Sequence, residues 1–413
     1  MISYQKSINI LNKAKIKIED EIISSSESIS RVASADVHSK YNYPSANNAA
    51  FDGYAVCSND TKNFSQKFKI IGSIAAGNKP FRKKIKKLET VEIMTGGIIP
   101  KGFDTIIPIE QIIFYPNKKN NKYILINKKI KKYNNVRFLG SDYKINNLVF
   151  KKGTIIQPNH ILALKTLGIN KIKVKKKPNI LFFSTGNEIS NSVHVPVWKV
   201  RNSISHYIHS LKNNFLFNFI NGGILKDNHE IIFKNHIDKM VSGKIDLIIT
   251  SGAVSAGKFD FIPSVIKKFD LSNYFKGVAI RPGKPVLFAK IKGKHKVIFG
   301  LPGNPISSAA CFRFFVHPYL VSCLGIKKEQ PIKAILKNSF TKKKNFTRFI
   351  KSKISTTNNG KLEVEVLLGQ ESFRIKSFVN SNIWTLFPSG KSNFKKGQII
   401  DCYFQNSSNN NLI

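Results

Sequence analysis

The chain has 413 residues, of which 42% are hydrophobic, and a formal net charge of +43. It is long enough for roughly two to four domains with cores of their own. It lacks a run of about 18 apolar residues and the apolar core of a signal peptide, which predicts a cytoplasmic protein with no membrane contact. The lysines are spread over every segment, so we interpret the charge as a compositional bias and expect no specific nucleic-acid interface.

The N-terminal third divides into two flanks and an insertion. Residues 1–45 are predicted to be helical and then extended, and residues 140–176 return to mixed structure with a helix at 160–167. Residues 46–139 hold short apolar runs separated by Gly and Asn turns, the pattern of a mostly β module. We therefore predict an N-terminal elongated domain, 1–45 plus 140–176, interrupted by an inserted β domain, 46–139.

The remainder of the chain has a different rhythm. Residues 177–325 alternate buried apolar runs with helical patterns, which predicts a parallel sheet with helices on both faces and a ligand at the carboxyl ends of its strands. Residues 326–405 again show short strands and turns, which favour a small C-terminal β barrel or sandwich, of which we take the barrel as the prediction. Residues 406–413 are predicted to be a disordered tail. The predicted fold class is α/β and multidomain.

The strongest chemical signal is the segment at residues 246–269, a short strand followed by a glycine-rich turn and a helix. Backbone N–H groups of such a turn converge on an anion, and the helix N-terminus adds partial positive charge. The turn residues that we expect to contact the ligand are Ser251, Gly252, Ser255 and Gly257. Asp260 follows them, and a carboxylate beside a bound anion needs a cation between the two. This points to Mg²⁺ and a phosphate-containing ligand; the alternative is that Asp260 only caps its helix.

The same turn also imitates a nucleotide-binding loop. Residues 252–258 read G-x-x-x-x-G-K, nearly a Walker phosphate loop. The next residue is Phe259, where that loop needs a Ser or Thr hydroxyl to ligate Mg²⁺. The missing hydroxyl argues against a nucleoside triphosphatase.

Similar polar loops follow three other predicted strands, and parallel strands bring such loops to one edge of the sheet. The loops supply Thr185, Gly186 and Glu188, then Asp227, and finally Gly303 and Asn304. Glu188, Asp227 and Asp260 are placed to share one divalent cation through oxygen ligands. The alternative is that each acid caps its own helix.

Matching cations come from the sequence RPGKP. Arg281 and Lys284 flank a rigid Pro-Gly turn, which suits a fixed anion such as a phosphate or an oxyanion. A solvated basic loop is the alternative in so basic a chain.

The motifs NNAAFDGYAV, EIMTGGIIPKGFDTIIPIEQ, STGNE, TSGAVSAGKFDF, RPGKP and GLPGNP occur in this order. With them the chain resembles the MoeA family of molybdopterin molybdenumtransferases, whose eukaryotic relatives include the E domain of gephyrin. The resemblance runs from the N-terminal helix to about Tyr403. It implies four domains, a homodimer and contacts with other proteins of molybdenum cofactor biosynthesis. It also implies a reaction in which molybdate is inserted into adenylylated molybdopterin with release of AMP, helped by Mg²⁺ or a similar cation.

The resemblance also suggests roles for individual residues. By motif, the catalytic residues would be Asp52, Thr95, Asp142, Glu188, Asp227 and Asp260. The substrate contacts would include Arg281, Lys284, Pro302, Pro305, Arg348 and Ser372. Part of this set lies in the β insert and part in the α/β region, which is understandable if the insert of one subunit faces the α/β domain of its partner. The chain departs from the usual family residues at Asn187, Ile204, Ala253 and Arg281. These departures bear on the efficiency of catalysis more than on the family assignment.

Three other functions remain as alternatives. A molybdopterin adenylyltransferase shares the motif of the glycine-rich turn but is usually that domain alone. A gephyrin-like scaffold needs partner surfaces that the sequence does not reveal. A nucleic-acid binder is suggested only by charge.

Overall fold

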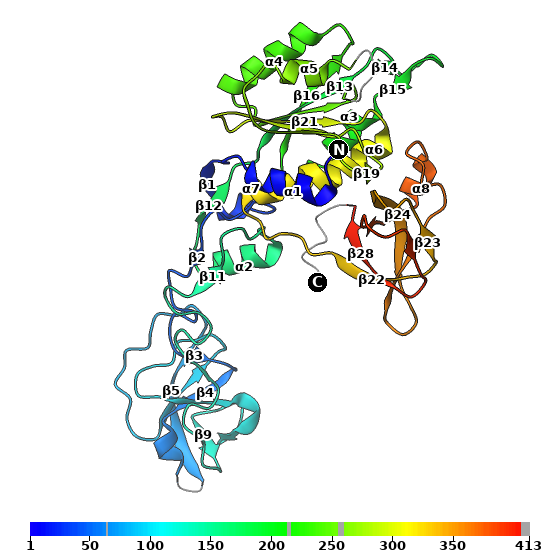
Figure 1. Ribbon diagram of the computed structural model, residues 1–413. Coiled ribbons are helices and arrows are strands. Elements are labelled where there is room, and N and C mark those ends of the chain that lie inside the picture. Colours follow the sequence, from blue (N-terminus) through cyan, green and yellow to red (C-terminus); the bar gives the residue numbers. More distant parts are fainter. Residues whose placement is uncertain (63–64, 213–215, 255–259, 406–413) are drawn as a thin grey trace.

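The computed structural model describes residues 1–62, 65–212, 216–254 and 260–405. The molecule is elongated: the β insert lies at one end, and a narrow segment connects it to an α/β body with a C-terminal β domain beside it (Figure 1). The predicted disordered tail, 406–413, lies outside the described residues. In the described part, no helix is long and apolar enough to cross a membrane.

The α/β body is built on a six-stranded sheet with the order β16-β13-β17-β21-β20-β18. Its strands are β13 (Asn179–Thr185), β16 (Asn218–Leu225), β17 (Leu247–Ser251), β18 (Leu271–Lys276), β20 (Leu287–Ile291) and β21 (Val297–Leu301). The first four in the spatial order are parallel, as the buried apolar runs predict. The edge formed by β20 and β18 is antiparallel, which the sequence pattern did not indicate.

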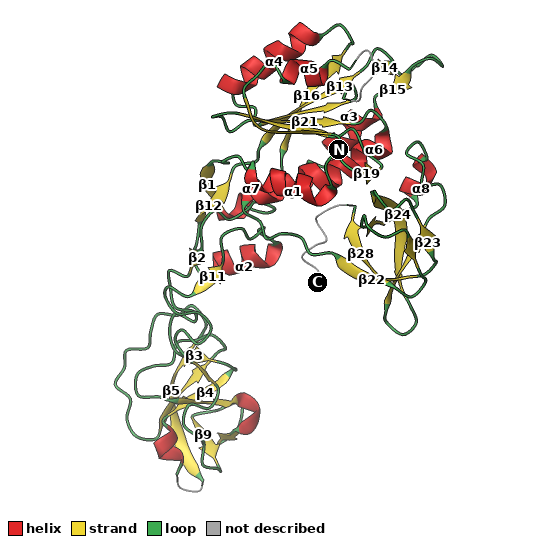
Figure 2. Cartoon of the chain, in the orientation of Figure 1, coloured by secondary structure: helices red, strands yellow, loops and turns green. Residues whose placement is uncertain are grey.

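Helices cover both faces of this sheet (Figure 2), which confirms the predicted arrangement. Successive side chains of a strand point to opposite faces, so Ile180 and Phe182 of β13 join one hydrophobic cluster while Leu181 and Phe183 join another. The first face carries α1 (Tyr4–Lys13), α3 (Ser203–Ser210), α6 (Pro305–Cys311), the π-helical segment η4 (Phe312–Val316) and α7 (His317–Leu324). The second face carries α4 (Glu230–Ser242) and α5 (Ile262–Ile266).

The segments that flank the insert pair with each other. The antiparallel pairs are β1 (Asp20–Ser24) with β12 (Lys171–Lys175), and β2 (Val37–His38) with β11 (Leu148–Phe150). Helix α2 (Pro158–Thr166) contributes Leu164 to the small core between them. Helix α1 instead packs into the α/β core through Leu11. The exact domain boundaries given by the sequence stay predictions.

The insert holds a six-stranded sheet in the order β7-β4-β6-β5-β9-β8. Its strands are β4 (Gly53–Val56), β5 (Gln66–Ile74), β6 (Glu89–Ile93), β7 (Thr105–Pro108), β8 (Ile113–Tyr115) and β9 (Tyr123–Ile126), beside a short pair of β3 (Asn48–Ala49) and β10 (Val136–Arg137). Ala55 and Tyr54, neighbours on β4, belong to two separate small clusters. The insert therefore has cores of its own.

The C-terminal strands close into a five-stranded barrel, as predicted, because β24 pairs with both β25 and β26. The strands are β22 (Ile332–Leu336), β24 (Thr347–Thr356), β25 (Leu362–Val366), β26 (Ile383–Phe387) and β28 (Ile399–Phe404), with α8 (Ile375–Val379) between β25 and β26. A short strand of the α/β body, β19 (Ile280–Arg281), pairs in parallel with the start of β24. This pairing attaches the barrel to the α/β body.

Candidate active site

A pocket of about 290 Å³ lies where the parallel strands of the α/β sheet end. Four strand ends contribute to it, as expected for an open parallel sheet. Its lining is Thr185, Gly186, Glu188, Asp227, Gly252, Ala253, Val254, Asp260, Pro285, Pro302 and Gly303. The sequence-based prediction that these loops converge is confirmed.

Glycines at two strand ends allow the loops to approach one another. Gly186 has φ of 129°, and a Cβ there would collide with the carboxylate of Glu188. Gly252 has φ of 100°, and a Cβ there would lie 2.6 Å from Oγ1 of Thr185. The Thr185 hydroxyl donates to the Ser251 carbonyl over 2.9 Å, which ties β13 to β17. The narrow approach of these loops therefore depends on residues without a side chain.

The three predicted metal ligands line the same pocket but differ in exposure. Glu188 is exposed, whereas Asp227 and Asp260 are half-buried. The backbone N–H of Asp227 donates to Oδ1 of Asn187 over 3.3 Å, so Asn187 helps to hold the neighbouring acid in place. All three side chains offer oxygen donors, which suit Mg²⁺.

These carboxylates do not form a preassembled metal centre. Among the described residues, no three His, Cys, Asp or Glu side chains group closely enough to hold an ion. Mg²⁺ is commonly bound by one or two carboxylates together with waters and substrate phosphates. The donors present fit an ion of that kind, held jointly with a phosphate-containing ligand, and the three-carboxylate ligand set stays a prediction.

A pair of arginines lies where the α/β body meets the barrel. Arg281 on β19 is in register with Arg348 on β24, and the Arg281 guanidinium lies 5.2 Å from the ring centroid of Phe346. Burial, followed by the charge of Arg281, lowers the pKa of Arg348. In the described part of the chain, the buried Nε of Arg348 has no hydrogen-bond partner. A bound anion would offset the repulsion between these charges and give the buried donor a partner.

The predicted residues of the insert form a separate pair. The backbone N–H and the hydroxyl of Thr95 donate to Oδ1 of Asp52 over 2.6 and 2.7 Å. These two bonds, the backbone bond first, lower the pKa of Asp52. Asp142 is exposed at the junction of the insert with the rest, where its N–H donates to the Tyr43 carbonyl. Within one chain, the insert and the α/β body lie at opposite ends of the molecule (Figure 1).

Three family models match the chain in order. They are the MoeA N-terminal region (domain I and II) over residues 2–168, a probable molybdopterin binding domain over 182–322 and the MoeA C-terminal region (domain IV) over 333–404. A molybdopterin molybdenumtransferase of Staphylococcus epidermidis is 30% identical over 98% of this chain and 96% of its own length. The chain belongs to the MoeA family.

Two further similar proteins support the same family assignment. A molybdopterin molybdenumtransferase of Staphylococcus aureus is 32% identical and covers 91% of this chain and 88% of its own length. A crystal structure of a molybdopterin biosynthesis MoeA protein from Pyrococcus horikoshii is 27% identical and aligns over 98% of this chain and 99% of its own, with a TM-score of 0.82. The multidomain MoeA architecture therefore extends over the whole described chain.

The structure separates the predicted MoeA site into parts. Eight of the predicted residues line the pocket: Thr185, Gly186, Glu188, Asp227, Gly252, Asp260, Pro302 and Gly303. Ser251 is buried at the end of β17, and α6 begins at Pro305 with Asn304 as its N-cap. The structure does not bring Asp52, Thr95, Asp142, Arg281, Lys284, Arg348 and Ser372 into the lining of this pocket. Ser255 and Gly257 lie outside the described residues.

Three pocket residues were not predicted as site residues. Ala253, with a positive φ of 52°, and Val254 continue the glycine-rich turn. Pro285 ends the RPGKP motif and lines the pocket, although neither Arg281 nor Lys284 does. All three residues lie in motifs that the sequence revealed, the glycine-rich turn and RPGKP. Within these motifs, only the polar residues and the glycines were predicted to contact the ligand.

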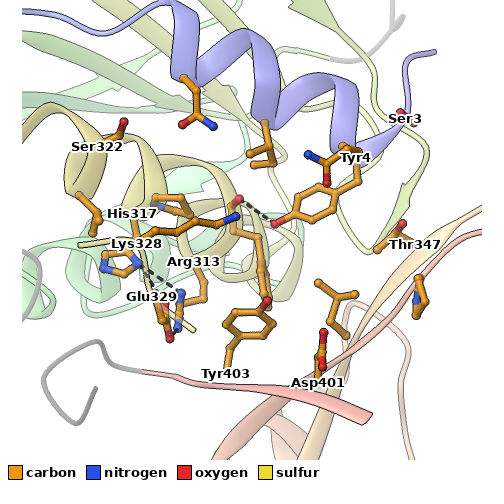
Figure 3. A pocket seen from close by; sticks show the side chains of 18 of the residues that line it. Ser3, Tyr4, Arg313, His317, Ser322, Lys328, Glu329, Thr347, Asp401 and Tyr403 are labelled. Atoms are coloured by element: carbon orange, nitrogen blue, oxygen red, sulfur yellow. Dashed lines mark hydrogen bonds and ion pairs between the residues drawn. The ribbon is translucent and has the colours of Figure 1, made fainter. Parts of the chain in front are cut away.

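A larger cavity of about 890 Å³ lies elsewhere, between α1, α7 and the barrel (Figure 3). It contains none of the predicted site residues. Arg313 at its wall donates through Nε to the Phe404 carbonyl over 2.7 Å and pairs with Glu329, and its NH1 lies 3.2 Å from Nδ1 of His317. Burial and then Arg313 hold the pKa of His317 well below its usual value. These contacts join the barrel to the α/β body.

Proposed function

We propose that this chain inserts molybdenum from molybdate into adenylylated molybdopterin and releases AMP. Membership of the MoeA family makes it a transferase of molybdenum cofactor biosynthesis. The observation that carries the finer assignment is the strand-end pocket, which is lined by three carboxylates and by residues of two glycine-containing loops. A phosphate-containing ligand with a bridging cation satisfies both features.

Glu188, Asp227 and Asp260 would hold Mg²⁺ together with the phosphates of the ligand. When bound, Mg²⁺ neutralises phosphate charge and stabilises the AMP that leaves. The turn after β17 lets Gly252 approach Thr185 closely, which leaves room for the ligand between the strand ends. With Mg²⁺ and the ligand bound, these side chains would hold the cation beside the phosphate groups.

Molybdate would be held by cations beside this pocket. Arg348 has an unused buried donor, and Arg281 is in register with it. Lys284 follows the Pro-Gly turn of the RPGKP motif and is exposed. It is next in sequence to Pro285, which lines the pocket. A compact dianion joins such charges through charge-assisted hydrogen bonds. Ser372 would supply a further hydroxyl by family resemblance.

We further propose a cytoplasmic homodimer in which each site is completed by the partner. Asp52 and Thr95 form an ordered pair in the insert, which lies at the opposite end of the molecule from the α/β body (Figure 1). Phe51 and Leu139 of the insert are exposed, with 54% and 49% of their surface accessible. Apolar exposure beside a candidate catalytic pair favours burial against a second copy. Contacts with other enzymes of the pathway are expected to be transient.

Purified protein, adenylylated molybdopterin, molybdate and Mg²⁺ together test the proposal. Release of AMP that depends on molybdate, with molybdenum retained on the pterin, is the expected result. An adenylyltransferase would instead consume ATP and accumulate adenylylated molybdopterin. Absence of AMP release from folded protein under these conditions would contradict the proposed function.

A further inference from the structure

The barrel contains a buried lysine whose amino group donates all its hydrogen bonds to the backbone of one loop. Lys351 on β24 is 1% exposed. Its Nζ donates to the carbonyls of Gly369, Glu371 and Arg374 over 2.8, 3.1 and 3.1 Å. An ammonium group has three donors, so each is matched to a carbonyl of the segment that connects β25 to α8. Burial lowers the pKa of this ammonium, and the charge of Glu371 offsets part of that effect.

The backbone of Lys351 holds the same loop. Its N–H donates to Oε1 of Gln370 over 3.1 Å, and Nε2 of Gln370 donates to the Lys351 carbonyl over 2.8 Å. The Ser377 hydroxyl adds bonds to the carbonyls of Gly369 and Arg374 over 2.6 and 3.0 Å. Side chain and backbone of one residue therefore fix both ends of a short segment, with half-buried Ser372 in its middle.

Helix α8, which follows this loop, rests on the α/β body. Ile375 and Phe378 line a small apolar pocket with Pro305 and Ile306 of α6, and the rings of Tyr207 and Phe378 lie 6.1 Å apart. Helix α6 starts directly after Pro302 and Gly303 of the active-site pocket. Helix α8 thus connects the end of the loop to α6, whose N-terminus follows two residues of that pocket.

Strand β24 connects this loop to the arginine pair. Arg348, in register with Arg281, precedes Lys351 by three residues on the same strand. We propose that Lys351 is a positioning residue, whose clamp on the β25–α8 loop sets Ser372 against Arg348 to form the oxyanion subsite. This inference rests on the proposed function for its ligand, molybdate.

A lysine is required because the loop turns three carbonyls toward one point. Replacing the ammonium by an apolar group leaves these carbonyls without donors in a buried place, and the loop must rearrange to find new ones. Displacing a binding group by about 1 Å can cost on the order of a hundredfold. Lys351 itself need not touch the ligand for this effect.

Molybdate affinity tests the inference without requiring turnover. Calorimetric titration of the whole protein with sodium molybdate should show affinity weakened about tenfold or more in Lys351→Met. Lys353→Met is the matched control, because Lys353 lies on the same strand but is exposed, and it should bind as wild type does. Lys351→Arg, which restores donors, should recover part of the affinity. Binding of adenylylated molybdopterin should be nearly equal in all four proteins.

Trypsin reports on the loop separately, because Arg374 at its end and Lys376 in the first turn of α8 are exposed. Cleavage there should be faster in Lys351→Met and unchanged in Lys353→Met. If Lys351→Met does not fold, Gln370→Ala removes the second set of loop bonds and should give the same two effects.

Unchanged molybdate affinity in a variant with a loosened loop would overturn the inference, as would a wild type that binds no molybdate. A wild type that binds molybdate but releases no AMP would instead contradict only the proposed function.

Discussion

The strand-end pocket and the Asp52–Thr95 pair are both predicted parts of one site, but they are built differently. The pocket is assembled inside one chain, because four strand ends and their glycines bring the acids together. The pair in the insert has good internal geometry but is exposed, and neither of its residues lines the strand-end pocket. This separation supports our proposal that the counterpart of the pair is supplied by another subunit.

The largest effect is expected in the pocket itself. Asp260→Asn should fold normally but lose about a hundredfold or more of AMP release, because the carboxylate that bridges to the cation is gone. Asp238→Asn on α4, an exposed acid paired with Lys234, is the control and should retain turnover. Steady-state AMP release with a Mg²⁺ titration is the measurement. Full activity in folded Asp260→Asn would remove the metal assignment.

The next effect concerns the cations beside the pocket. Lys284→Ala should raise the molybdate concentration needed for insertion by about tenfold to a hundredfold, since one charge-assisted contact to a dianion is lost. Lys294→Ala, an exposed lysine in the turn before β21, should change nothing. If Lys284→Ala weakens binding of the adenylylated pterin and leaves the molybdate dependence intact, the residue holds nucleotide phosphate instead.

Two glycine substitutions distinguish a loss of pocket geometry from the backbone strain that any residue with a side chain suffers at a positive φ. Gly186→Ala should lower turnover by about tenfold or more, because its Cβ would push the Glu188 carboxylate away while its φ is also unfavourable. Gly293→Ala shares a positive φ, 66°, but has open space around the new Cβ. It should lose some thermal stability and keep its activity. Equal losses of activity in both variants would show that the Glu188 contact has no functional role.

The smallest effect is expected at the insert pair. Thr95→Ala removes the hydroxyl bond but keeps the stronger backbone bond, so the pKa of Asp52 should rise part of the way toward its ordinary value. Because the folded pKa is below the unfolded one, the pair stabilises the insert above the ordinary carboxyl pKa and loses this effect as the pH falls through the lowered value. NMR titration of the Asp52 carboxyl measures the shift; an identical pKa in both proteins would contradict it.

The sequence predicted those features that depend on local pattern. The buried runs at β13, β17 and β21 and the polar loops after them indicated a parallel sheet and its ligand edge. The antiparallel strands β18 and β20 were missed because Ser272 and Asn273 interrupt the apolar pattern of β18, and its pairing is decided by tertiary contact.

Other features depend on residues far apart in the sequence. The Lys351 clamp joins a strand residue to carbonyls about twenty positions later, and backbone acceptors leave no signature in side-chain identity. The register of Arg281 with Arg348 likewise required the barrel to be placed against the α/β body. Ala253, Val254 and Pro285 contribute shape to the pocket rather than charge, so a search for polar residues did not select them.

Complementation between two inactive variants tests the shared site most directly. Asp52→Asn and Asp260→Asn are each expected to be inactive when alone. After mixing under conditions that exchange subunits, half of the dimers would carry one site with an intact insert and an intact pocket, so AMP release should recover to about a quarter of the wild-type rate. Light scattering and differently tagged subunits verify the exchange. No recovery in verified mixed dimers would contradict the account, because it would mean that each chain completes its own site.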